Sequence, residues 1–408
     1  MLNSLVQVFR RNLRSYILII ALAVIWLAFG IAAPNYWSGD HIQDILTQMA
    51  IIAIMATGMV FVIVTGGIDL SVGYGAGFVS VVAAALLYYG IVEKPIHALF
   101  PGIDTLTLEV LTALMTVLIC MALGVAMGIF QGGIIAYLGV PPFIVTLGGL
   151  YIFKSGILLV TQGKSLFIAS NDTYKFIAQG LIPPNAGFVI AFLVAVALFV
   201  FVFVGRSRKQ KYGIELPSLA LDLLKAAIFS ILIFGYVIVV NRTFDPTSDP
   251  SLRGVPFLVL ILAVIAVLMS YVSTNTRYGR YAYAIGGNRE ASRLSGINIK
   301  KSVFLIFVTM GALMGVSGIA LAAYVGSGTT AAGQGYELDV IASCILGGTS
   351  TLGGEGTVFG AIVGALILQS LLNGLQMMNV NSNVQYLIRG LVLIAAVWAD
   401  IALKKKRT

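Results

Sequence analysis

The sequence is poor in charged residues, histidine and cysteine. Only 10% of its 408 residues are charged, whereas a soluble domain usually carries about 25%. Two cysteines, both in apolar stretches, are too few for a disulfide framework or a zinc site, and two histidines exclude a His-rich metal cluster. We therefore expect neither a metal nor a cofactor. With 59% hydrophobic residues, the chain is expected to be an all-α polytopic membrane protein.

The sequence also lacks the patterns of a catalytic site. It contains no Gly-x-Ser-x-Gly nucleophile elbow and no paired His/Asp constellation. The segment GILLVTQGKS (156–165) resembles a P-loop, but six residues instead of four separate its first glycine from GKS. We therefore expect no enzyme activity, and any ATP used by this protein must bind to another chain.

Positive charge is concentrated in a few places. Of the 25 Lys and Arg residues, 17 fall in segments 1–15, 206–211, 277–301 and 404–407, which contain one acidic residue, Glu290. By the positive-inside rule these segments are cytoplasmic. Such segments bind anionic membrane lipids, so the net charge of +9 does not imply a nucleic acid partner.

Apolar runs predict about twelve transmembrane helices, with both termini cytoplasmic. The run 337–350 is short and polar at one end, so it is either a short span or half of a broken one. The spans are expected near 16–33, 46–65, 72–90, 109–130, 142–162, 187–205, 219–240, 255–273, 302–325, 337–350, 356–377 and 384–403.

The segment TGGIDLSVGYG (65–75) breaks an apolar stretch with four glycines and an acid, Asp69. Irregular backbone survives in a bilayer only where protein or a water-filled cavity covers it. Asp69 either caps a helix that starts near Leu70 or contacts the substrate. A second break, LGGTSTLGGEGTVFG (346–360), has a similar pattern and suggests two related halves, although QGGIIAYLGVPPF (131–143) is a third kink.

Other polar residues in the apolar runs are few. Lys225 follows Asp222 by three residues and could pair with it, and Arg389 or Lys154 could neutralise Asp69. Amides at Gln369, Asn373, Gln376 and Gln385 either face a substrate or bond helices together. The residues predicted to line a translocation path or form its motifs are Gly66, Gly67, Asp69, Ser71, Gly73, Gly347, Gly348 and Asn373.

The segment 274–301 is the longest cytoplasmic loop. Asn288 is a good N-cap, Arg289 to Ser295 can form two helical turns with Glu290 near the start, and Gly296 can end them. This helix either docks on a partner protein or lies on lipid, and its few apolar residues favour docking. The predicted coupling residues are Gly286, Gly287, Asn288, Arg289, Glu290, Ala291, Arg293, Leu294 and Gly296.

The motif GGIDLSVG (66–73), the loop YAIGGNREASRLSGIN (283–298) and the segment ELDVIASCILGGTSTLGGEGTVFG (337–360) resemble the permease subunits of bacterial ABC importers for monosaccharides. The resemblance covers nearly the whole chain. It implies a single permease domain in the bacterial inner membrane that works with a cytoplasmic ATPase, an external sugar-binding protein and a second permease copy. It also implies that 286–296 couples ATP hydrolysis to transport.

One departure from this family is the segment 206–273, which adds two spans to a ten-span core. The xylose-type permeases are similar in carrying such an insert, including RGVP. The resemblance therefore implies import of xylose or a related aldose. The alternative is an ion-coupled secondary transporter of a small polar solute, in which Asp69, Glu337 and Asp339 would carry protons.

Overall fold

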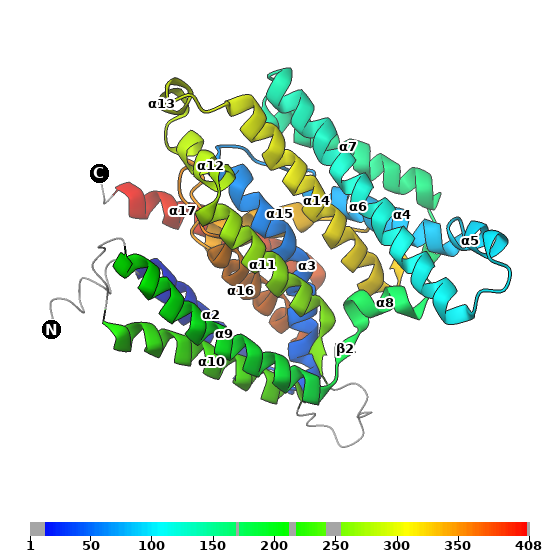
Figure 1. The fold of residues 1–408 in the computed structure, drawn as a ribbon, viewed down its shortest axis with the longest axis horizontal. Helices are drawn as coiled ribbons and strands as arrows, with labels where there is room; N and C mark the ends of the chain where they lie inside the picture. Colours follow the sequence, from blue (N-terminus) through cyan, green and yellow to red (C-terminus); the bar gives the residue numbers. More distant parts are fainter. Residues whose placement is uncertain (1–12, 169–170, 212–217, 242–253, 406–408) are drawn as a thin grey trace. The chain divides into compact units, whose positions relative to one another are not determined.

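The computed structural model describes residues 13–168, 171–211, 218–241 and 254–405, and each predicted span overlaps a helix in it (Figure 1). Most of the basic segment 1–15, half of 404–407 and parts of the predicted insert lie outside the described residues. The helices are α2 (Leu13–Ala32), α3 (Gly39–Val64), α4 (Val72–Tyr88), α5 (Glu93–Leu99), α6 (Thr105–Tyr137), α7 (Pro142–Thr161), α8 (Asp172–Gln179), α9 (Pro184–Lys211), α10 (Leu219–Asn241), α11 (Phe257–Asn275), α12 (Arg277–Gly287), α13 (Arg289–Leu294), α14 (Ile299–Val325), α15 (Tyr336–Leu346), α16 (Val358–Met377) and α17 (Ser382–Lys405).

Strands are confined to short loop segments. Two antiparallel pairs of two-residue strands join β1 (Leu166–Phe167) to β4 (Ser327–Gly328) and β2 (Leu181–Ile182) to β3 (Val255–Pro256). The all-α membrane class predicted from composition is confirmed.

Among the described residues, eight helices are long and apolar enough to cross a membrane, and the bent pair α4 and α5 adds a ninth. Helices α2 and α17 contain shorter apolar stretches, Leu18–Ala32 and Ser382–Trp398. Helix α15 has 11 residues and is only about 16 Å long, so it is too short to cross a bilayer core by itself. The number of crossings, about twelve, stays a prediction.

The helices form two compact units. The smaller unit contains residues 35–44 and 180–257, and in it α9 and α10 form an antiparallel hairpin. In this hairpin Arg206 forms an ion pair with Asp222 (2.6 Å). The predicted partner of Asp222, Lys225, was therefore wrong, because the hairpin brings a cation from α9 to this carboxylate. The boundaries of the predicted insert, 206–273, stay a prediction.

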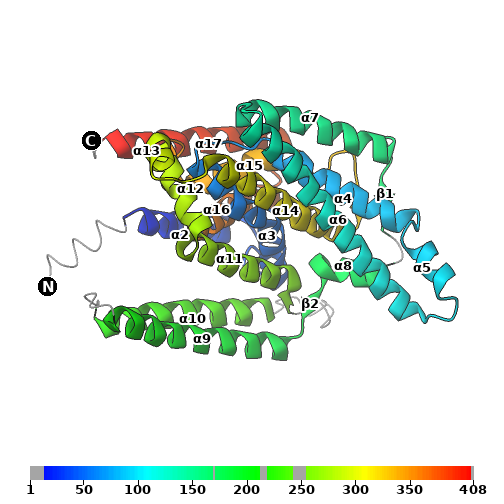
Figure 2. The same cartoon turned by 45° about the horizontal axis from the view of Figure 1, so that its top comes forward.

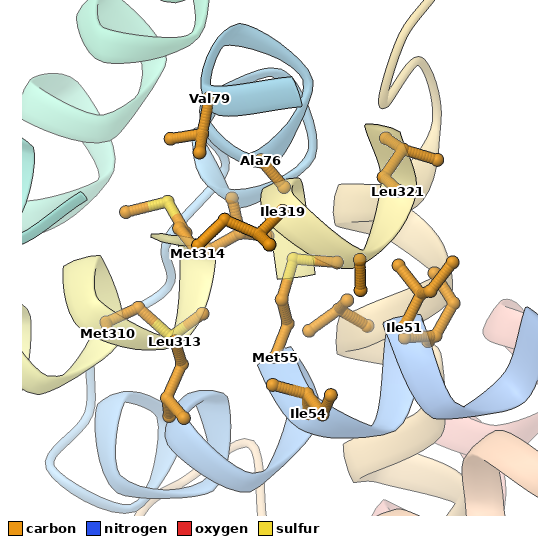
Figure 3. Packing of buried hydrophobic residues seen from close by; sticks show 14 of the residues in the cluster. Ile51, Ile54, Met55, Ala76, Val79, Met310, Leu313, Met314, Ile319 and Leu321 are labelled. Carbon is orange, nitrogen blue, oxygen red and sulfur yellow. The ribbon is translucent and has the colours of Figure 1, made fainter. Parts of the chain in front are cut away.

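The larger unit is built around α3. Within the membrane-length part of this helix, 94% of the residues are buried. Its apolar side chains, such as Ile51 and Met55, pack with Ala76 of α4 and with Met314 and Leu321 of α14 (Figure 3). A helix surrounded by protein on all sides needs no polar face, which explains why α3 is apolar all round.

Small residues allow the helices of this unit to pack closely. Helices α6 and α14 cross where Gly124 and Gly128 face Gly311 and Gly315, and a Cβ at Gly311 would overlap the Gly124 carbonyl oxygen. Such glycine-lined crossings are typical of membrane helices, which gain little hydrophobic energy by leaving lipid. In both views α13 lies at one end of this unit and α5 at the other (Figure 1, Figure 2).

Candidate functional site

The first glycine break begins with a Schellman motif at the end of α3. Gly66 has φ 82°, its N–H donates to the Ile63 carbonyl (2.9 Å), and the Gly67 N–H donates to the Val62 carbonyl (2.9 Å). This arrangement satisfies two of the carbonyls left open at a helix end, and the positive φ favours glycine. Gly66 therefore ends α3, a role that the glycine pattern made plausible.

The second break ends α15 with the same motif. Gly348 has φ 88°, its N–H donates to the Ile345 carbonyl, and the Thr349 N–H donates to the Cys344 carbonyl, both at 2.9 Å. The positive φ falls on the first glycine of the pair in one break and on the second in the other. The two breaks thus end their helices with the same motif, but the glycine with positive φ is shifted by one residue within the glycine pair.

Gly347 and Gly73 have a different function, because both permit close packing. A Cβ at Gly347 would overlap the Gly360 carbonyl of α16, and a Cβ at Gly73 would come within 2.6 Å of the Gly333 carbonyl oxygen. These contacts hold α15 against α16 and the loop before α15 against α4.

Asp69 is completely buried between α3 and α4. Its Oδ1 accepts hydrogen bonds from the Ser71 N–H (2.9 Å) and the Ser71 hydroxyl (2.7 Å), and Gln131 of α6 donates to the same hydroxyl (2.8 Å). Helix α4 begins at Val72, not near Leu70, so Asp69 forms a turn with Ser71 and does not cap the helix directly.

The charges predicted as partners of Asp69 lie elsewhere. Arg389 pairs with Asp339 (3.2 Å), and the Lys154 ammonium lies 5.5 Å from the centre of the Tyr74 ring. In the described part of the chain, Asp69 has no ion pair, and its Oδ2 is buried without a hydrogen-bond partner. Asp69 thus has one oxygen fixed by the fold and one left open.

Helix α13 begins at the predicted residue and ends one residue earlier than predicted. The Asn288 side chain accepts a hydrogen bond from the Ala291 N–H (2.9 Å), and Gly296 with φ 82° follows the last turn. Arg293 donates to both carboxylate oxygens of Glu290, and this contact lowers the pKa of Glu290. Leu294 is 74% exposed, so the helix presents a charged surface and one free apolar side chain.

Helix α12 was missed by sequence analysis, which treated RYGRYAYAIGG as loop. Its apolar side chains Tyr278, Ala282 and Ile285 follow the helical spacing i, i+4, i+7, and this is the signal that would have found it. The Thr276 hydroxyl accepts a hydrogen bond from the Gly279 N–H (3.3 Å) at its start. The helical pattern was weak because the segment contains glycines and many polar residues and only one narrow face of the helix is buried.

The end of α12 meets both glycine breaks at one point. A Cβ at Gly286 would overlap the Val64 carbonyl oxygen, and this carbonyl accepts a hydrogen bond from the Gly354 N–H (2.9 Å). Close by, the Tyr283 hydroxyl donates to the Gly356 carbonyl (2.8 Å). We call Val64, Gly286 and Gly354 the three-way junction. It connects the arm that carries α13 to the end of α3 and to the loop after α15.

A cavity of about 320 Å³ lies beside this arm. Its lining includes Gly66 and Gly67 of the first break, Pro142 of the third kink, and the cations Arg289 and Lys300. The fold thus brings together two predicted path residues and one predicted coupling residue that are far apart in sequence.

Asn373 does not belong to this region. It lies in a polar cluster where Gln369 donates to Gln48 of α3 (2.7 Å) and Asn373 donates to the same oxygen (3.4 Å). Gln48 in turn donates to the Tyr324 hydroxyl of α14 (2.9 Å). Because these amides bond three helices to one another, the geometry favours helix–helix bonding for Gln369 and Asn373 over substrate contact.

Comparison with known proteins reveals relatives along almost the entire chain. A family model described as the permease component of the branched-chain amino acid transport system matches residues 41–397. The xylose transport system permease protein of Haemophilus influenzae is 38% identical over 397 residues, covering 97% of this chain and 98% of the relative. Its counterpart in Escherichia coli K12 is 35% identical over 396 residues, with 97% and 93% covered. The ribose import permease protein of E. coli K12 is 31% identical over 382 residues, with 94% and 92% covered. No solved structure matches the chain.

Proposed function

Because the chain belongs to the family of permease components of the branched-chain amino acid transport system, we propose that it is the membrane-spanning subunit of an ATP-driven, binding-protein-dependent importer for a monosaccharide. Xylose or a related aldose is the proposed substrate. The similarity to the two xylose permease proteins supports it, since it extends over 97% of this chain. The family is named after branched-chain amino acid transport, whereas these relatives are named after xylose transport.

The three-way junction is the observation that carries the mechanism. Helix α13 follows α12 after a single residue, Asn288, and the end of α12 contacts the backbone of α3 and of the loop after α15. Three backbone segments in contact, with no long side chain between them, form a stiff connection. A displacement of α13 is therefore transmitted through α12 to both glycine breaks, where α3 and α15 end.

The driving force is proposed to come from a separate ATPase subunit that binds α13 on the cytoplasmic side. Arg277, Arg280, Lys300 and Lys301 flank this helix, and the positive-inside rule places such a cluster in the cytoplasm. The same rule places both termini there. An external sugar-binding protein delivers the sugar, and a second copy of this chain, in a lipid bilayer, completes the pathway.

The decisive experiment is purification in a mild detergent after co-expression with a candidate ATPase and sugar-binding protein. We expect the three chains to copurify and, in vesicles, to take up labelled xylose only when ATP is supplied. Uptake by the permease alone, driven by a proton or sodium gradient, would instead identify a secondary transporter that uses buried carboxylates such as Asp69.

The orientation is tested separately in sealed cells. Leu294→Cys puts a thiol on the exposed surface of α13, whereas Ser292 is 5% exposed and provides a poorly reactive control position. We expect a membrane-impermeant maleimide to label Leu294→Cys only after the cells are opened. Labelling of intact cells would place α13 outside and exclude contact with a cytoplasmic ATPase.

A further inference from the structure

The turn between α16 and α17 borders an open polar pocket of about 580 Å³. Gln376 comes from the last turn of α16, Asn381 from the connection, and Gln385, Tyr386 and Arg389 from the first turns of α17. Gln376 and Gln385 are the two of the four amides singled out in the sequence that do not join the polar cluster around Gln48. We refer to this open pocket as the α16–α17 pocket.

The α16–α17 pocket lies at the opposite end of its unit from α13. Helix α16 begins at Val358, two residues after the Gly356 carbonyl that binds Tyr283 of α12, and it has 20 residues. At 1.5 Å per residue it reaches about 30 Å, the thickness of a bilayer core. The pocket therefore opens on the membrane side opposite the proposed ATPase contact.

The charge in the α16–α17 pocket is balanced. Arg389 donates to Asp339 of α15 (3.2 Å), and Asp339 is 4% exposed, so the cation is already neutralised by a buried carboxylate. The remaining polar groups that line the pocket are amides and the hydroxyls of Ser382 and Tyr386. A pocket with compensated charge and many neutral donors and acceptors attracts a neutral ligand more than an anion.

These groups suit a polyhydroxyl ligand. Each amide can both accept and donate a hydrogen bond, and so can each sugar hydroxyl. Tyr386 is 59% exposed, and the Arg389 guanidinium lies over its ring, 5.6 Å from the centre. The Arg389 Nε–H is buried and unpartnered among the described residues, so the guanidinium is incompletely hydrogen bonded. The volume lies within the usual range for small-molecule pockets, roughly 300–1,000 Å³.

We propose that the α16–α17 pocket is an entry site that binds a neutral monosaccharide on the side opposite α13. The proposal rests on the proposed function, because it assigns a site to the sugar that the permease would carry. Arg389 links this site to α15 through Asp339, and α15 ends at the second glycine break. A single ion pair thus connects the sugar pocket to α15, and the loop after α15 contributes Gly354 to the three-way junction.

The test measures protection of a single thiol in vesicles that contain the complete transporter. Gln376→Cys places a thiol in the α16–α17 pocket, and Asn383→Cys places one on the same turn, where the side chain is exposed but does not line the pocket. Both native cysteines are buried, so they react slowly with a membrane-impermeant maleimide. We expect xylose to slow labelling of Gln376→Cys at least threefold and to leave Asn383→Cys unchanged.

A second ligand tests the charge argument. Xylonate has a similar size and similar hydroxyls but carries a negative charge, so we expect it to protect Gln376→Cys much less than xylose does. Equal or stronger protection by xylonate would overturn the assignment of a neutral ligand. Protection by the binding protein but not by free xylose would make the pocket a protein-docking surface and would also overturn it.

Transport by variants provides an independent measure. Removing one hydrogen-bonding amide with Gln376→Ala should lower ATP-driven xylose uptake roughly three- to tenfold, while Asn383→Ala transports like the parent. If the parent complex imports xylose but Gln376→Cys is not protected and Gln376→Ala transports normally, the site is wrong and the proposed function stands. If the parent complex imports no monosaccharide at all, both proposals fail.

Discussion

The two glycine breaks end their helices with the same backbone motif, but they are held in place differently. The first is anchored inside the helix bundle by side chains, because Asp69 holds Ser71 and Gln131 holds the Ser71 hydroxyl. The second is anchored by backbone groups, since the loop that follows it donates from Gly354 to the Val64 carbonyl and accepts at Gly356 from Tyr283. Within the described residues, α12 contacts the backbone of both breaks but forms a hydrogen bond only with the second one, through Tyr283.

From this difference we expect the first break to stay fixed and the second to move during transport. Side chains buried at several points, such as Asp69 and Ser71, hold a segment in one conformation because each lost bond leaves a buried polar group unsatisfied. The loop after α15 is held by one hydrogen bond to α3 and one to α12, so it can shift together with α12. We therefore expect motion of α13 to displace the loop after α15 more than the segment around Asp69.

The largest effect should come from Gly286→Ala. The added Cβ would overlap the Val64 carbonyl oxygen, so α12 must move away from α3, at a cost of about 1–3 kcal/mol in the free energy of unfolding. We expect ATP hydrolysis to continue while xylose uptake falls at least tenfold, roughly the effect of about 1.4 kcal/mol on a coupling equilibrium.

Gly287→Ala, at the neighbouring predicted coupling residue, tests whether the close approach at Gly286 is what matters. A Cβ at Gly287 meets no atom within 4 Å, and alanine is a better helix former than glycine. Uptake should therefore remain at the parental level. If Gly286→Ala also transports normally, the three-way junction does not carry the coupling.

The next effect concerns the surface of α13. Replacing both Glu290 and Arg293 with alanine removes an exposed ion pair, so the unfolding temperature of the purified chain should hardly change. If α13 binds the ATPase, uptake should fall roughly tenfold, as is usual for the loss of central interface residues. Alanine at Asp172 and Lys175, which form an i, i+3 pair on α8, is the control, and normal uptake by the α13 variant would contradict docking.

Asp69 tests how firmly the first break is fixed. Asp69→Ala leaves the buried Ser71 N–H without its acceptor and leaves the Ser71 hydroxyl only the Gln131 Oε1 (3.2 Å), which should cost about 1–3 kcal/mol in the free energy of unfolding. Asp69→Asn keeps an oxygen in that place, so we expect it to assemble and to transport like the parent. An Asn variant that assembles but does not transport would show that the charge itself is needed, as an ion-coupled mechanism requires.

The smallest effect is expected at Gly66. Its φ is 82°, and a Cβ there would meet no atom within 4 Å, so Gly66→Ala should cost only the strain of the left-handed conformation, about 1–2 kcal/mol. Gly66→Asn should recover part of this, because asparagine tolerates positive φ. Thermal unfolding in detergent measures both, and an equal loss for Ala and Asn would show that the backbone conformation is not the cause.

Much of the fold could be predicted from the sequence, because membrane helices are long apolar segments that must satisfy their own hydrogen bonds. Local signals also located α13, since Asn288 and Gly296 act on neighbours within a few residues. The predicted partner of Asp222 was wrong because the cation that binds it comes from another helix, α9. Helix α12 was missed because its single buried face is short.

The sequence by itself determined that this chain lies in a membrane, where its long apolar helices run and where glycine interrupts them, because hydrophobicity and helix caps act over short distances along the chain. Only the tertiary structure decided that the end of α12 touches both breaks, and that Gln376 and Gln385 share a pocket with Arg389. Contacts between backbone groups such as Val64, Gly286 and Gly354 involve no particular side chain. Their only trace in the sequence is glycine at the positions where two backbone segments approach closely.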